Sequence, residues 1–347
     1  MSFRFTMRRL AVGLVGVAAC GPSPVAPPAP LVSANEVRQI VGALAADSME
    51  GRRTGTPGSS RAGRFLAERM RSYGLEPGGD SSYFQTVHYQ VASGPEGETL
   101  RLHGSGSADS VPAREVTDYN LIGLVRGSDP QMRDQAVVLG AHYDHVGVGK
   151  PVAGDSIYNG ADDDASGVAA VLAAAQALAK APPKRSVIFL LTSGEEFGVL
   201  GTQWYLTRPT FPLARTIADL QVEMVGRPDS LVGGVGKLWL TGYERSTMGD
   251  SFAKAGIPIV ADPRPDFRFF ERSDNIVFAL RGIPAHTLSS FSLHSDYHQP
   301  SDEVERIDFA HLAQAAEVVV RATRLLADQP APRWHPGGRP TPSTPQP

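Results

Sequence analysis

Cysteine is nearly absent from this chain of 347 residues. The single cysteine, Cys20, excludes any intramolecular disulfide. An excess of charge of either sign is also missing, and the net charge of −3 gives no long-range reason to expect nucleic acid or anionic lipid as a partner. No internal repeat is visible. The length then allows a large buried core, in one α/β domain or in two smaller domains.

The N-terminal segment has the pattern of an export signal. Two arginines, Arg8 and Arg9, precede the apolar stretch 10–19, which is too short to span a membrane. The residues Val17-Ala18-Ala19-Cys20 resemble a bacterial lipobox, which implies cleavage before the cysteine and attachment of lipid to it.

These features predict a lipoprotein signal peptide over 1–20 and a semi-rigid, Pro-rich tether over 21–34. The expected location is the cell envelope of a bacterium, at the outer membrane facing the periplasm, with membrane contact only through the lipid on Cys20. The alternative is a plain secreted protein with an incidental cysteine.

Strand and helix patterns alternate through the middle of the chain. Short apolar runs bounded by turn residues predict buried strands, and stretches with helical periodicity predict helices. The expected strands are 136–139, 187–191, 217–224 and, weakened by its proline, 283–288. The expected helices are 35–46, 59–73, 167–180 and 304–326. This alternation predicts an α/β fold with a mixed, largely parallel sheet and helices on both faces.

Two segments depart from that alternation. Residues 83–125 show enough apolar–polar alternation to predict short antiparallel strands. From about Asp328 the chain is rich in proline, which predicts a disordered tail over 328–347. The folded domain is therefore expected over 35–327.

Two adjacent carboxylates, Glu195 and Glu196, follow the expected strand 187–191 on a loop that begins with Gly194. The carboxyl ends of strands are where ligands bind in open α/β sheets. Adjacent carboxylates repel each other there unless a positive charge or a shared proton offsets the repulsion. A metal site accounts for both, with one glutamate as a ligand and the other handling the proton of a water molecule. Taken alone, the pair would be two solvated glutamates of a surface loop.

Ligand-type residues follow the other expected strands in the same way. The segment 140–145 follows the first strand, and Glu223 lies near the end of the third. An acidic run at 162–164 opens a helix, and the segment 294–302 adds two more histidines. Histidines with several carboxylates form a zinc-type set, whereas an all-oxygen set would indicate calcium or magnesium.

Four motifs carry a resemblance to a known family. They are GAHYDH (140–145), NGADDDASG (159–167), SGEEFGVLG (193–201) and YHQPSD (297–302). In this order and spacing they resemble the co-catalytic di-zinc aminopeptidases, a family that also includes glutamate carboxypeptidase-like enzymes and glutaminyl cyclases. The resemblance extends over about 35–326. It implies a zinc exopeptidase fold of the phosphorylase/hydrolase-like type, two Zn²⁺ ions, and a peptide or small amide as substrate.

The resemblance implies a first zinc site around His142. The carboxylate of Asp144 would lie behind His142 and fix its ring. Asp163 would bridge both metals, and Glu223 would complete the first zinc. The best-known members of the family have aspartate at this last position, so this chain adds one methylene there.

At the second zinc, Glu196 and His298 would be the ligands, and Glu195 would act as the general base and acid. His294 is the only serious rival of His298, but the Gln-Pro-Ser-Asp that follows His298 fits the family better. His145 is expected in a loop or in the wall of the site rather than among the ligands.

Three further residues have structural explanations. His286, inside an expected strand, is predicted to be a core histidine with satisfied hydrogen bonds. Asp162 and Asp164 can simply cap the helix that follows them, where the helix dipole favours negative charge.

The predicted function is a zinc-dependent exopeptidase, most directly an aminopeptidase that uses hydroxide held between two zincs, with Glu195 as its base. A carboxypeptidase, a glutaminyl cyclase and a degenerate peptidase domain that serves as a surface binding module are the alternatives. Arg268 and Arg272 are candidates for lining the substrate pocket, with a surface ion pair as the other explanation. The oligomeric state is left open.

Overall fold

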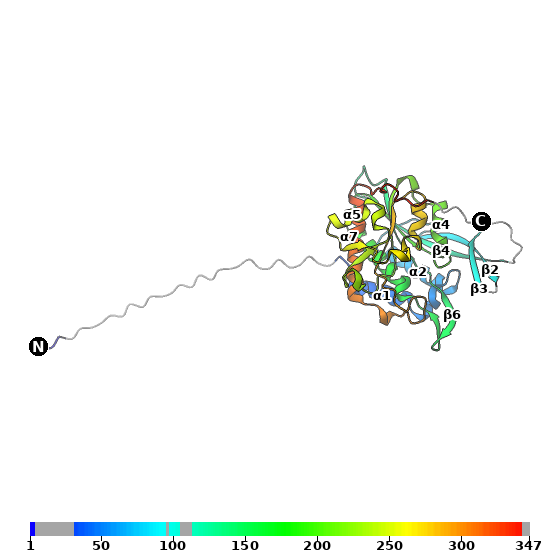
Figure 1. Ribbon diagram of the computed structural model, residues 1–347, viewed down its shortest axis with the longest axis horizontal. Coiled ribbons are helices and arrows are strands. Elements are labelled where there is room, and N and C mark those ends of the chain that lie inside the picture. Colours follow the sequence, from blue (N-terminus) through cyan, green and yellow to red (C-terminus); the bar gives the residue numbers. More distant parts are fainter. Residues whose placement is uncertain (4–30, 95–96, 105–112, 342–347) are drawn as a thin grey trace. The chain divides into compact units, whose positions relative to one another are not determined.

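The computed structural model describes residues 1–3, 31–94, 97–104 and 113–341, and a compact unit begins at Leu31. The centre of this unit is a sheet of ten strands (Figure 1). The order along the sheet is β11-β10-β12-β9-β5-β8-β4-β2-β3, and β1 pairs with β4. In chain order the strands are β1 (Glu76–Pro77), β2 (Phe84–Gly94), β3 (Gly97–Leu102), β4 (Ala113–Val125), β5 (Ala136–His142), β8 (Ser186–Thr192), β9 (Thr216–Val222), β10 (Leu238–Leu240), β11 (Ile259–Ala261) and β12 (Ala285–Ser289).

The middle of the sheet is parallel, and one side of it is antiparallel. β8, β5, β9 and β12 are parallel neighbours, with Leu139 of β5 opposite both Phe189 of β8 and Leu220 of β9. β4 pairs with β8 in the antiparallel sense, and β2 and β3 extend this side. The predicted α/β fold with a mixed sheet is therefore confirmed, and the antiparallel strands expected in 83–125 are β2, β3 and β4.

Helices cover both faces of the sheet because successive residues of a strand point to opposite sides. Odd-numbered residues of β5 and β8 belong to one core and even-numbered residues to another. The helices of the first face are α1 (Ala34–Leu44), α2 (Pro57–Ser72), α3 (Gly167–Lys180) and α7 (Phe309–Asp328). Those packed in the second core are α4 (Leu200–Thr207) and α6 (Asn275–Leu280), and α5 (Thr247–Lys254) packs beside β11.

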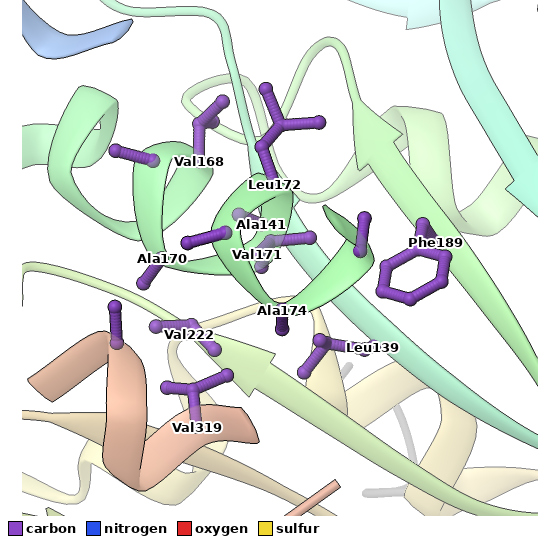
Figure 2. Close-up of a cluster of buried hydrophobic side chains, with 14 of the residues drawn as sticks. Leu139, Ala141, Val168, Ala170, Val171, Leu172, Ala174, Phe189, Val222 and Val319 are labelled. Atoms are coloured by element: carbon purple, nitrogen blue, oxygen red, sulfur yellow. The ribbon is translucent and has the colours of Figure 1, made fainter. Parts of the chain in front are cut away.

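The helix α3 lies at the centre of the first core. Its alanines and valines are buried nearly all round, because the sheet covers one side of the helix and α1 and α7 cover others. Figure 2 shows these side chains gathered among Leu139, Phe189 and Val222 of the strands and Val319 of α7. This packing fixes the turn before α3, which carries the acidic run, against the ends of the strands.

Helix starts differ from the predicted starts where a side chain caps the helix. α2 begins two residues earlier than predicted, because Thr56 accepts an amide of the first turn and Pro57 occupies the first helical position. α7 begins at Phe309 rather than at 304, because Asp308 accepts two amides of its first turn. A separate 3₁₀ turn occupies 304–306.

The predicted disorder of the tail is wrong for residues 329–341. Trp334 forms a β-bridge with Ser246, and its indole N–H donates to the Gly282 carbonyl at 3.0 Å. The Thr247 amide donates to the Arg333 carbonyl at 2.9 Å. A proline-rich segment lacks amides for regular structure, but it can still pack in an extended form, which composition alone does not reveal. Residues 342–347 lie outside the described residues.

At its other end the folded unit begins earlier than the predicted 35. Val32 is buried, and the Leu31 amide donates to Glu317 of α7 at 3.1 Å. Most of the predicted signal peptide and tether, including Cys20, falls on residues 4–30, outside the described residues. Within the part of the chain that the structure describes, no helix combines the length and the apolarity that crossing a membrane requires.

A hairpin separates the first two motifs. It consists of β6 (Gly147–Val152) and β7 (Asp155–Tyr158), which form a small sheet of their own (Figure 1). Its residues are mostly exposed, so it lacks the apolar alternation from which strands are predicted.

Candidate metal centre

The predicted site residues meet at the carboxyl ends of the parallel strands. His142 is the last residue of β5, Glu223 directly follows β9, and Glu196 lies on the loop after β8. Asp163 comes from the turn before α3, and His298 from the loop after β12. Parallel strands bring their carboxyl ends to the same edge of a sheet, so segments far apart in the sequence converge there.

Three of these residues, His142, Asp163 and Glu223, form a group that we call cluster 1. The Nε2 atom of His142 is 3.2 Å from Asp163 Oδ1 and 3.9 Å from Glu223 Oε1. The side chains of His142 and Asp163 are almost fully buried, whereas 24% of the Glu223 side chain is exposed. Cluster 1 is therefore a buried group with one solvent-facing member.

Asp163 is shared with a second group, cluster 2, which also contains His145, Glu196 and His298. The Nε2 atom of His298 is 3.1 Å from Asp163 Oδ2 and 3.0 Å from Glu196 Oε2. The Nδ1 atom of His145 is 2.8 Å from Glu196 Oε1 and 3.8 Å from Asp163 Oδ2. The two oxygens of Asp163 thus face different clusters, which is the arrangement of a bridging carboxylate.

Both clusters have the donor chemistry of a metal site. The Nε2 atoms of His142 and His298 and the Oδ1 atom of Asp163 are buried without a hydrogen-bond partner among the described residues. Such an unpaired group costs about 1–3 kcal/mol. Unpaired ring nitrogens that converge on carboxylates therefore indicate positions for cations, and imidazoles with carboxylates suit zinc. The residues present fit the two Zn²⁺ ions that the sequence predicts.

The surroundings of the adjacent Glu195 and Glu196 shift the pKa values of the two carboxylates in opposite directions. Burial raises the pKa of Glu195 well above its ordinary value. For Glu196, burial and the charge of Asp163 also favour protonation, but contacts with His145 and His298 outweigh them and lower its pKa to about 2. Neighbouring groups whose pKa values are pushed apart by their surroundings indicate different chemical tasks.

The ring of His142 is oriented differently from the prediction. Its Nδ1 atom lies 3.1 Å from the main-chain oxygen of Asp144 and 3.8 Å from the carboxylate. The carboxylate instead accepts the Glu195 amide at 3.1 Å and the Thr54 hydroxyl at 3.0 Å. Asp144 therefore holds the ring through its backbone and holds the Glu195 loop through its side chain.

Three acidic residues around Asp163 hold its turn in place. Asp164 accepts the first amide of α3 and an amide just after β9, each at 3.0 Å, so its predicted capping role is confirmed. Asp162 accepts another amide of the segment after β9 at 2.7 Å, which joins the turn to that segment. Asp302 accepts the amides of Asp162 and Asp163. The carboxylate of Asp163 is thus presented by a turn that is bonded on both sides.

A buried arginine that the sequence patterns did not indicate connects the two loops that carry His145 and Asp163. Arg52 is fully buried, and its guanidinium donates four hydrogen bonds to main-chain oxygens at 2.6–2.9 Å. The acceptors are the carbonyls of Leu44, Tyr143, Asn159 and Gly160. An arginine between glycine-rich neighbours gives no sequence signal of such a role, because the acceptors are backbone atoms distant in the chain.

His145, expected in a loop or in the wall of the site, lies on the loop that follows β5. The structure places its fully buried ring within cluster 2. The one sequence signal for this position is that His145 lies three residues after His142, in the same turn at the end of β5.

Two other histidines considered in the sequence, His294 and His286, lie outside both clusters. His294, the rival of His298, has its Nε2 atom 2.9 Å from Asp162 Oδ2. His286 is a core histidine, as predicted, with one ring nitrogen bonded to the Thr241 carbonyl and the other to the Ser246 hydroxyl.

A cavity with aromatic walls lies beside Glu223. It is lined by Glu223, Met224, Trp239, Thr241, Phe269, Arg272, Thr287, Ser289, Phe291 and Tyr297. The guanidinium carbon of Arg272 is 5.3 Å from the centre of the Phe269 ring. Arg268 is exposed and pairs with Glu271. Of the two candidate arginines, one therefore lines the cavity and the other forms a surface ion pair.

Fold and clusters together define the class of this protein: a mixed α/β sheet that presents a paired metal site at the carboxyl ends of its parallel strands. The model of Peptidase family M28 matches residues 120–323, more than half of the chain. The chain belongs to this family, and the resemblance to the di-zinc aminopeptidases is confirmed.

The matched stretch covers only part of the curated relatives. The probable leucine aminopeptidase 2 of Aspergillus fumigatus is 31% identical over 174 residues, which cover 49% of this chain and 32% of that protein. The chain thus spans about a third of the length of the curated leucine aminopeptidases it matches.

Solved structures match over most of the chain. BSAP, a zinc aminopeptidase from Bacillus subtilis, has a TM-score of 0.62 at 15% identity, covering 86% of this chain and 96% of that one. A glutaminyl cyclase of Porphyromonas gingivalis has a TM-score of 0.59 at 19% identity, covering 85% and 98%. At these identities the likeness shows the fold alone.

Proposed function

We propose that this protein is a zinc-dependent exopeptidase, and specifically an aminopeptidase that releases N-terminal residues from peptides. The observation that carries the proposal is the convergence of three imidazoles and three carboxylates in two clusters that share Asp163. Membership of Peptidase family M28 and the names of its relatives support the same assignment.

Zinc ions held by the two clusters would supply Lewis acidity, which acidifies water and polarises a peptide carbonyl. Glu195 is the proposed proton acceptor, which takes a proton from the attacking water and passes it to the leaving amine. Burial raises its pKa, which strengthens Glu195 as a proton acceptor. Glu196, whose pKa is lowered, stays ionised and suits the role of a ligand.

The cavity beside Glu223 is the proposed place for the side chain of the released residue. Trp239, Phe269 and Phe291 give it apolar walls, and it is adjacent to cluster 1 through Glu223 itself. An apolar or aromatic N-terminal residue therefore gains the most by burial there.

Arg272 favours a second candidate function, that of a carboxypeptidase. It lines the same cavity, and its guanidinium forms no ion pair with a described residue. A free guanidinium suits a carboxylate, which the C-terminus of a short peptide would supply.

A substrate panel with zinc analysis alongside tests the proposal. The panel contains peptides with a free N-terminus, the same peptides N-acetylated, the same peptides C-amidated, and peptides that begin with glutamine. We expect hydrolysis only where the amine is free, about two zincs per chain, and loss of activity on chelation. Cleavage of acetylated but not of amidated peptides would instead support the carboxypeptidase. Cyclisation of glutamine without hydrolysis would support a cyclase, and zinc-free protein inactive on the whole panel would support a binding module.

We also propose that the protein is an exported bacterial lipoprotein, anchored at the outer membrane and facing the periplasm. The support is the signal-like segment, the lipobox-like residues before Cys20 and the absence of any other cysteine. The variant Cys20→Ser should move the protein from membrane to soluble fractions without a change in specific activity, and Ser23→Ala serves as a matched control. An unchanged membrane fraction would contradict the lipid anchor and point to an uncleaved signal segment.

A further inference from the structure

We infer that the two metal sites are unequal: His145 is a fourth protein ligand that closes cluster 2, while cluster 1, with three ligands, keeps a position free. The inference rests on the proposed function only in requiring that both clusters bind zinc. The family resemblance assigns one histidine to each site, so the second histidine of cluster 2 is a property of this chain's own residues.

The distances within cluster 2 fit a single ion. Ligands about 2.0–2.2 Å from a tetrahedral zinc lie about 3.4 Å from one another. Four separations among the cluster 2 atoms are 2.8, 3.0, 3.1 and 3.8 Å, and they lie around this value. His145 contributes two of them, to Glu196 and to Asp163, from the same nitrogen.

A hydrogen bond to Glu196 alone accounts for only part of this placement. The Nδ1 atom of His145 faces both carboxylates of the cluster, and its ring meets the His298 ring edge to face, with centres 5.5 Å apart. The four ligand atoms all lie within 4.8 Å of one another. Two imidazoles and two carboxylates are thus arranged around one point.

Gly160 provides the room for the His145 ring. A side-chain carbon at Gly160 would lie 2.6 Å from the Cγ and Cδ2 atoms of His145, and the glycine has a φ of 59°. A larger residue would therefore push the ring out of the cluster and would strain the backbone. The NGADDDASG motif thus leaves space for a ligand that belongs to the preceding motif.

Cluster 1 differs because it has three protein ligands, of which Glu223 also lines the cavity. Zinc sites with four protein ligands are typical of structural zinc, whereas sites with three leave a position for water or substrate. Cluster 2 should therefore bind its ion first and release it last. Cluster 1 should hold a weaker, exchangeable ion next to the cavity.

The variant His145→Asn tests whether His145 is a zinc ligand or only a hydrogen-bond partner of Glu196. Asparagine can still donate a hydrogen bond toward Glu196, but it lacks the imidazole nitrogen that binds zinc. The measurement is zinc bound per chain during a graded chelator titration, with circular dichroism to check the fold. His294→Gln is the matched control, because His294 is a nearby histidine outside both clusters.

The unmodified protein should release its zincs in two steps. In His145→Asn the tighter step should weaken by at least about 100-fold, while the weaker step and the His294→Gln profile stay the same. Two unchanged steps in His145→Asn would overturn the inference and leave a hydrogen-bonding role. Protein that binds no zinc at all would overturn the proposed function instead.

A measurement on the unmodified chain keeps the inference testable if the variant does not fold. X-ray absorption of protein loaded with one equivalent of zinc reports how many imidazoles surround the ion. We expect two imidazoles at one equivalent, and an average between one and two at two equivalents. A single imidazole at both loadings would overturn the inference without affecting the proposed function.

Discussion

The histidines of the two clusters and the core histidine His286 differ in how their ring nitrogens are satisfied. In the clusters, the Nε2 atoms of His142 and His298 have no hydrogen-bond partner among the described residues. On β12, both nitrogens of His286 are bonded to protein groups at 2.7 Å. Burial alone therefore does not mark a functional histidine. Unsatisfied nitrogens that converge on carboxylates do.

The same contrast extends to the charge of the rings. Burial lowers the pKa of His286 to about 4, so this ring stays neutral in the folded protein. For His298 burial acts in the same direction, but the carboxylates of Asp163 and Glu196 outweigh it and raise its pKa to about 10. The core region excludes a positive charge, and the cluster region attracts one.

Replacing Glu195 or Glu196 should give the largest effect on activity and zinc binding. It tests whether the cluster region has a catalytic role in addition to a structural one. Glu195→Gln keeps the shape of the side chain and removes only the proton acceptor. We expect kcat to fall by ~10²–10⁴ while zinc content and melting temperature stay the same. Glu196→Gln should lose zinc from cluster 2 and also lose the stability that bound metal provides.

Zinc per chain and kcat, measured side by side for both variants, check this prediction. Loss of zinc in Glu195→Gln with retention in Glu196→Gln would reverse the two roles. Full activity in both variants would show that neither glutamate takes part in catalysis.

The second prediction concerns the core histidine, His286, and the pH dependence of the protein's stability. Its pKa is about 4 in the folded protein and near 6.5 in the unfolded chain. Below pH 6.5 the unfolded chain takes up a proton that the folded ring refuses, so stability falls as the pH drops from about 6.5 towards 4. Between pH 7.5 and 5 this single group should account for about 2 kcal/mol of unfolding free energy.

Urea unfolding in the presence of chelator, at both pH values, measures that loss without a contribution from metal. The variant His286→Asn should show a pH dependence smaller by the same amount. Identical pH dependence in both proteins would show that His286 is protonated in the fold and that the two regions are alike.

The smallest expected effect comes from Glu223→Asp, which shortens one ligand of cluster 1 by a methylene. The carboxylate of Glu223 is already 3.9 Å from His142 Nε2, so shortening should withdraw it further. We expect the weaker zinc to bind on the order of 10-fold less tightly, with the tighter zinc unaffected. Calorimetric titration of metal-free protein with zinc resolves both steps, and equal affinities before and after the change would remove Glu223 from the ligand set.

Much of the site could be predicted because strand ends are visible in the sequence. The apolar runs of β5 and β8 stop abruptly at polar residues, and parallel strands align such stops at one edge. His142, Glu196 and Glu223 lie at or just after such strand ends. The resemblance to the di-zinc aminopeptidases, rather than the pattern alone, selected these three residues and Asp163 as ligands.

The remaining features depend on the paths of loops, which local pattern does not specify. The position of His145 is set by the turn after β5 and by the space at Gly160. Arg52 bonds carbonyls that become neighbours only after folding. The tail packs through Trp334 although its composition resembles that of disordered segments.

The hydrogen bonds of Arg52 and Thr54 show that the stretch matched by the family model begins later than the stretch that holds the site together. All six cluster residues lie within the stretch 120–323 that the family model matches. Arg52 and Thr54, which bond to the loops that carry cluster residues, lie far ahead of it. A shortened chain starting at 120 would contain all six cluster residues but would lack the side chains that hold their loops in place. The segment that sequence similarity identifies is therefore shorter than the segment needed to form the site.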